Sequence, residues 1–176
     1  MSTAWQPLSW IIFHTLALNY NDKYHEHYKS FFESFTKIIP CRICRTHYTE
    51  NINKSKMTIE ENINKDNIFN WTVDLHNSVN KINYKKVWSY DEAKKYYLKN
   101  NFNQKALKIF VFEYVRANFK KNPEKTQNLI KMLNALAYLY PHEQKREKLI
   151  NFKEKFVLNR FTFKCWLTAF VLIIQY

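Results

Sequence analysis

Two cysteines of this 176-residue chain stand at a spacing that suits thiol chemistry. Cys41 and Cys44 follow Pro40, which ends the preceding helical pattern, so they occupy positions i and i+3 at the start of the next helix. This spacing permits a disulfide, and the helix N-terminus together with Arg42 and Arg45 stabilises a thiolate. Because a thiolate is the form that attacks a disulfide or a flavin, the motif predicts redox chemistry.

The same residues leave two other interpretations open. Together with His47, Cys41 and Cys44 offer three ligands to zinc, and any of the other histidines would complete a four-ligand site. In the second interpretation both cysteines stay reduced and are structural. Because C-x-x-C serves redox and metal sites alike, the motif taken alone does not decide between them.

A second group of polar residues lies between Phe69 and Asn80. On a helix His76 and Asn80 share a face and Asn77 and Asn80 share a turn, so one imidazole and two amides point in nearly one direction. Burying such groups without partners costs about 1–3 kcal/mol each. The group therefore suits a flat heteroaromatic ligand that can be stacked and hydrogen-bonded, and the alternative is a solvated polar face.

The composition narrows the fold class. The chain has no glycine, which excludes the dinucleotide-binding fingerprint, the P-loop and the kinase glycine-rich loop. The absence of glycine also argues against a hairpin-rich β fold, although asparagines can take some left-handed positions. With 46% hydrophobic and 24% charged residues the chain is globular, and an all-α protein with asparagines at its helix ends is the simplest prediction.

Helical periodicity runs through the whole chain. Helices are expected at about residues 7–19, 23–39, 41–51 and 67–82, with Asp66 as an N-cap, and from Ser89, which forms a capping box with Glu92, to about residue 100. The run 100–103 is the candidate boundary between a domain at 1–100 and a helical extension at 101–176.

Three further helical patterns follow the boundary. They lie at about 107–119, at 123–139 after Pro123, and from His142 towards the end. The stretch from Cys165 is nearly all apolar but has only 12 residues, whereas a membrane span needs about 20. It predicts a buried terminal helix, and a short membrane or partner anchor is the alternative.

The net charge of +13 lies mainly in the extension, which holds 14 basic against 5 acidic residues. Residues 1–100 hold 14 against 10. A basic surface attracts nucleic acid, anionic lipid or acidic proteins, so a nucleic-acid-binding helical protein is a second alternative function. No secretory signal is apparent at the N-terminus, and three cysteines do not make a disulfide framework, so a secreted protein is not expected.

Three motifs in this order carry a resemblance to a known family. They are Trp10-x-x-x-His14, Pro40-Cys41-x-x-Cys44-x-x-His47 and Trp71-x-x-x-x-His76-Asn77-x-Val79-Asn80. Over about residues 5–97 the chain resembles the Erv/ALR FAD-linked sulfhydryl oxidases. The resemblance implies an all-α bundle of four or five helices, usually a homodimer, that binds FAD beside the C-x-x-C.

The resemblance also assigns roles by position. Cys44 becomes the flavin-proximal sulfur and Cys41 the distal sulfur that exchanges with a protein dithiol, while electrons pass through the flavin to O2 and give hydrogen peroxide. The positions implied to contact FAD are Trp10, His14, Tyr20, Cys44, His47, Trp71, His76, Asn77, Asn80, Lys85 and Trp88. No metal is implied.

The chain departs from the family pattern in several places. Cys165 is the one further cysteine, so an intrachain shuttle pair is missing, and we expect it to be a buried free thiol. Asn53 and Tyr90 stand where cellular members have a structural disulfide, and Tyr84 stands where a glycine is usual. A small form without a shuttle pair but with an extension resembles oxidases of large cytoplasmic DNA viruses, which implies a host-cytoplasm or virion location.

Overall fold

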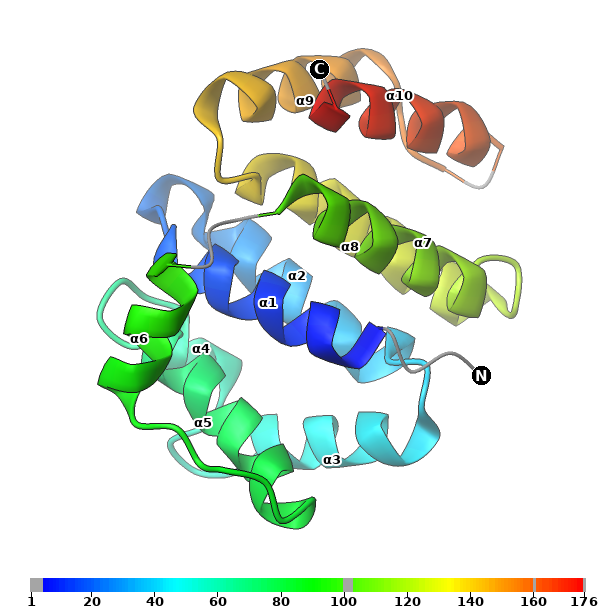
Figure 1. Cartoon of the computed structure of the whole chain (residues 1–176). Helices are drawn as coiled ribbons and strands as arrows, with labels where there is room; N and C mark the ends of the chain where they lie inside the picture. The colour runs from blue at the N-terminus through cyan, green and yellow to red at the C-terminus, as the bar shows by residue number, and fades with distance from the viewer. Residues whose placement is uncertain (1–4, 100–102, 160, 176) are drawn as a thin grey trace.

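The computed structural model describes residues 5–99, 103–159 and 161–175, and within these ranges it contains helices and turns but no strand. Figure 1 shows the helices stacked in layers, with α1 and α2 between the α3–α6 group and the C-terminal helices. The bounds are α1 Trp5–Leu18, η1 Asp22–Tyr24, α2 His25–Ile38, α3 Arg42–Ile52, α4 Ile59–Asn62, α5 Ile68–Ile82, α6 Tyr90–Lys99, α7 Gln104–Asn118, α8 Pro123–Leu139, α9 Glu143–Lys155 and α10 Phe163–Gln175. The predicted all-α fold is confirmed.

Several helix ends use the predicted signals. Ser89 and Glu92 form the expected capping box, in which each backbone N–H donates to the other side chain at 3.0 and 3.2 Å. Pro123 stands in the first turn of α8, and Asn122 caps that helix by accepting from the N–H of Lys125.

Three local predictions are wrong. Asp66 does not cap α5; Asn67 holds the N-cap position without a side-chain bond, because the side chain of Asn64 accepts the N–H groups of residues 66 and 67. In the described residues, Lys56, Tyr84 and Lys120 take the left-handed backbone positions, whereas asparagines stand at helix ends as expected, for example Asn53 after α3 and Asn83 after α5.

The other two errors concern the C-terminal end. The expected single helix after His142 is two helices, α9 and α10. Asn159 breaks the pattern, because its side chain accepts the N–H groups of Phe161 and Thr162 and so turns the chain without glycine or proline. Helix α10 buries one face, as expected, but Cys165 is exposed, so the prediction of a buried thiol is also wrong.

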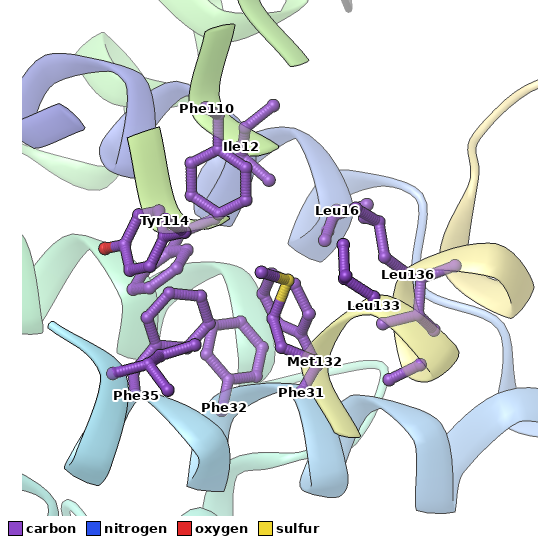
Figure 2. Close-up of a cluster of buried hydrophobic side chains, with 14 of the residues drawn as sticks. Ile12, Leu16, Phe31, Phe32, Phe35, Phe110, Tyr114, Met132, Leu133 and Leu136 are labelled. Carbon is purple, nitrogen blue, oxygen red and sulfur yellow. The ribbon is translucent and has the colours of Figure 1, made fainter. Parts of the chain in front are cut away.

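One hydrophobic core joins the two parts of the chain. Figure 2 shows side chains of α1 and α2 packed against side chains of α7 and α8, with Phe35 and Tyr114 among them. The rings of Phe35 and Tyr114 meet edge to face at 5.3 Å. Helix α2 is covered by α8 and α1 by α7, so the scaffold of the candidate site is stabilised from the extension. The proposed boundary at 100–103 lies largely outside the described residues.

Candidate active site

The C-x-x-C opens helix α3, where the sequence places it. A disulfide joins Cys41 to Cys44, and their Cα atoms are 5.2 Å apart. Cys41 is the N-cap residue, and its sulfur accepts the backbone N–H of Cys44 at 3.2 Å. Arg45 donates to the carbonyl of Ile39 at 2.5 Å, which ties the new helix to the end of α2. The Cys41 sulfur therefore lies at a helix N-terminus and accepts a backbone N–H, an environment that favours a thiolate after reduction.

Beside the disulfide lies a cavity of about 740 Å³, within the range of small-molecule sites. Its wall is formed by α1, α3, α5, α6, α7 and the segment that follows α5. The predicted residues that line it are Trp10, Cys44, His47, His76, Asn80, Lys85 and Trp88. Cys44 is in this wall and Cys41 is not, so the two sulfurs have different surroundings.

Stacked rings form one wall of the cavity. Trp10 of α1 and His76 of α5 are parallel within 7° with centroids 4.3 Å apart, and His14 lies behind them, hydrogen-bonded to His76 at 3.1 Å. Burial and then the neighbouring His76 hold the pKa of His14 well below its usual range. Burial and then Lys85 lower the pKa of His76 to about 4. Both imidazoles are therefore neutral at pH 7.

Two asparagines of α5 fix the backbone of the segment that follows the helix. The amide of Asn77 donates to the carbonyl of Trp88 at 2.8 Å and accepts the N–H of Trp88 at 2.9 Å. Asn80 donates to the carbonyl of Lys86 at 2.9 Å. The sequence predicts that both amides bind a ligand directly. Asn80 lines the cavity, whereas Asn77 is not in its wall and uses one N–H and its oxygen to position Trp88.

Tyr84 makes the sharp turn at the start of this segment. Its φ of 53° is in the left-handed region that glycine adopts most easily, at the position where the resembled family usually has glycine. The Tyr84 side chain is 99% exposed, so the turn keeps its shape without burying the ring.

Four predicted contacts are not part of the cavity wall: His14 and Asn77, described above, and Trp71 and Tyr20. Trp71 is buried beneath the cavity, with its indole N–H donating to the carbonyl of Met57 at 2.8 Å and its ring against Phe32. Tyr20 is bonded to His25 at 2.9 Å at the other end of α1. These two residues stabilise the bundle and are not brought to the cavity wall.

Tyr97 and Tyr114 are cavity residues that sequence reasoning missed. Tyr97 of α6 lies with its ring 4.3 Å from that of His14. Ala93, four residues earlier, is buried in the same cluster, and this helical spacing could have predicted a buried face but not its neighbours. Tyr114 comes from the extension and bonds Ser9 at 2.9 Å, a contact over 105 residues that no local pattern predicts.

The alternative of a zinc site has no support in the structure. Cys41 and Cys44 are joined to each other, and the described residues contain no group of three or more histidine, cysteine or acidic side chains that could hold a metal. No helix in the described ranges is both long and apolar enough to cross a membrane.

Comparison with known proteins decides the family. The model of the Erv1/Alr family matches residues 7–99, more than half of the chain and the part that surrounds the cavity. The chain belongs to this family. It is 36% identical over 95 residues to a probable FAD-linked sulfhydryl oxidase of Acanthamoeba polyphaga mimivirus, a match covering 51% of this chain and 65% of the relative, slightly less than two thirds.

Two relatives named FAD-linked sulfhydryl oxidase come from African swine fever virus. A protein of a pig isolate from Kenya is 30% identical over 119 residues, covering 65% of this chain and 92% of the relative. A protein of a tick isolate from Malawi is 30% identical over 103 residues, covering 56% and 84%. No solved structure matches this chain significantly.

The cavity fits the cofactor that these names imply. Its volume, its parallel Trp10–His76 wall, the cationic Lys85 and the adjacent Cys44 sulfur match a molecule that combines flat rings, phosphates and a thiol-reactive centre. Trp10, His76, Lys85 and Trp88 are the residues that would contact it.

Proposed function

We propose that this protein is a FAD-dependent thiol oxidase that forms disulfides in protein substrates with O2 as the electron acceptor. The observation that carries the proposal is the disulfide of Cys41 and Cys44 at the edge of a cavity that suits FAD, with Cys44 in the cavity wall. Membership of the Erv1/Alr family and the names of the viral relatives support it.

The chain's own part of the reaction is thiol–disulfide exchange. A substrate thiolate attacks the sulfur of Cys41, the bond between Cys41 and Cys44 breaks, and Cys44 leaves with the electron pair as a thiolate. A second substrate thiolate attacks the same substrate sulfur, Cys41 leaves, and the substrate departs as a disulfide. Cys41 and Cys44 are then both reduced and hold the two electrons taken from the substrate dithiol.

When bound, FAD supplies the two-electron acceptor that restores the disulfide and passes the electrons to O2, giving hydrogen peroxide. Cys44 lines the cavity and so has the position from which a sulfur reaches that acceptor. Cys41 caps the helix from outside the cavity wall, where a substrate thiolate can approach it. The stacked Trp10 and His76 orient a flat ring, and Asn77 holds Trp88 in the cavity wall.

The visible absorption spectrum of the purified protein, followed by release of the chromophore, tests this function. We expect a yellow protein that releases FAD, is bleached by dithiothreitol and recovers its colour in air. A colourless protein that also fails to take up added FAD would overturn the proposal.

The remaining expectations extend the proposal. We propose protein dithiols as substrates, a location in host cytoplasm or virions, and residues 101–176 as an extension that supports the oxidase part. A homodimer stays a prediction, and because α7 and α8 cover α1 and α2, an interface between copies has to use other surfaces. Contact of the basic extension with nucleic acid also stays a prediction, tested by salt-dependent binding.

A further inference from the structure

A chain of hydrogen bonds links the interior of the bundle to the cavity. The hydroxyl of Thr72 donates to the carbonyl of Phe69 at 2.7 Å and is bonded to Nδ1 of His14 at 2.9 Å. The other nitrogen of His14, Nε2, is bonded to Nδ1 of His76 at 3.1 Å. His76 then lines the cavity, and its Nε2 has no protein partner among the described residues.

The donor and the acceptor of each hydrogen bond in this chain follow from the bond between Thr72 and Phe69. A carbonyl oxygen only accepts, so the single proton of the Thr72 hydroxyl is used on Phe69. The hydroxyl oxygen must then accept from Nδ1–H of His14, which leaves Nε2 of this neutral ring as an acceptor. His76 therefore donates through Nδ1–H, and its Nε2 keeps a lone pair. The reverse order would place a lone pair of Thr72 against the Phe69 carbonyl.

We propose that Thr72 is a positioning residue whose hydroxyl fixes His14 and His76 as Nδ1–H tautomers, so that His76 presents a hydrogen-bond acceptor to the cavity. The complementary ligand carries an N–H or O–H donor at that point. The low pKa values of both rings support this arrangement, since a charged ring would carry protons on both nitrogens. The assignment of the ligand as FAD rests on the proposed function, whereas the tautomers do not.

The tautomers are read directly by two-bond ¹H–¹⁵N correlation spectra of the imidazoles near pH 7. The wild type is expected to show Nδ1–H at His14 and His76. Thr72→Val keeps the shape but removes the acceptor, so both rings are expected to take the Nε2–H form that free histidine favours. Thr72→Ser restores the hydroxyl and is expected to restore Nδ1–H.

Thr15 offers a matched control. Like Thr72 it is a buried threonine next to His14, but its hydroxyl has no hydrogen-bond partner. Thr15→Val is therefore expected to leave both tautomers unchanged. Nε2–H at His76 in the wild type, or unchanged tautomers in a folded Thr72→Val protein, would overturn the assignment to Thr72.

FAD binding by fluorescence titration tests the consequence for the ligand. Thr72→Val turns the cavity-facing acceptor of His76 into a donor and is expected to weaken FAD binding about tenfold, the effect of one well-placed hydrogen bond. Thr72→Ser and Thr15→Val are expected to stay within about twofold of the wild type. Unchanged affinity in a Thr72→Val protein with altered tautomers would refute the ligand contact alone. A wild type that binds no FAD would refute the proposed function, while the spectra still decide the tautomers.

Discussion

The pair of hydrogen bonds from Asn77 to Trp88 should stabilise both the fold and the cofactor site. Asn77→Ala removes bonds of 2.8 and 2.9 Å, each of which contributes about 1 kcal/mol net. Trp88 is half-buried, so water replaces part of what its backbone loses, and the expected loss of unfolding free energy is about 2 kcal/mol. For a chain of this length that lowers Tm by about 4–8 °C.

The same substitution frees the segment after α5, which carries Lys85 and Trp88 into the cavity wall. Ordering a freed residue on binding costs about 1–2 kcal/mol, so FAD affinity should fall about tenfold or more. Thermal unfolding without FAD measures the first effect, and titration with FAD at a temperature where the variant is folded measures the second.

Asn70 provides the matched control. It stands two turns earlier on α5, is half-buried, and makes no side-chain hydrogen bond within the described residues. Asn70→Ala should change stability by less than about 0.5 kcal/mol and leave FAD binding intact. If Asn77→Ala behaved like this control in both assays, the positioning role of Asn77 would be wrong. A lowered Tm with unchanged FAD affinity would refute only the link to the cofactor.

Four further results are expected. Cys44→Ser should still bind FAD but lose oxidation of dithiothreitol, measured by oxygen uptake, whereas Cys165→Ser should keep both; loss of turnover in the second variant would mean that the redox pair is incomplete. Because the pKa of His76 is lowered from 6.5 to about 4, the unfolded chain binds an extra proton between these values. The stabilising contribution of neutral His76 is therefore complete above pH 6.5 and falls as the pH drops, by about 1.4 kcal/mol per unit and about 3 kcal/mol at pH 4, in addition to the contribution of His14. Urea unfolding at a series of pH values should show this slope, and His76→Gln should reduce it; an equal slope in both proteins would contradict the assignment. Trp71→Phe should lower Tm by several degrees through loss of the bond to Met57 but leave the flavin spectrum unchanged, since Trp71 lies outside the cavity wall. A chain ending at residue 99 should be insoluble or unfolded by circular dichroism, because the α1 and α2 side chains that α7 and α8 cover would be exposed; a folded, FAD-binding fragment would show that the extension is dispensable.

The sequence predicted the elements that depend on local signals. The apolar spacing of α2, the proline before Cys41 and the capping box at Ser89 each act within a few residues, and each is present in the structure. The C-x-x-C was therefore placed correctly at the start of a helix. Its neighbours in the cavity wall were identified mainly through the family resemblance.

The errors concern groups whose partners are distant in sequence. Asn77 and His76 are adjacent polar residues, yet His76 lines the cavity while the amide of Asn77 is satisfied by a backbone 11 residues later. The spacing of the two residues does not predict which one lines the cavity and which one bonds the backbone. Trp71 resembled a ligand contact for the same reason, because an aromatic residue near polar groups suits either a core or a binding site.

The extension meets the active site through the end of helix α2. The last carbonyls of a helix lack partners within it, and Pro40 follows too closely for the helix to continue. The side chain of Asn118, on α7, donates to the carbonyl of Ile38 at 2.8 Å, while Arg45 of α3 bonds that of Ile39. Two successive carbonyls are thus satisfied, one by the extension and one by the helix that carries the disulfide. Because Cys41 lies two residues beyond Ile39, α7 helps to fix the turn that presents the redox pair, and the extension is physically part of the site's support.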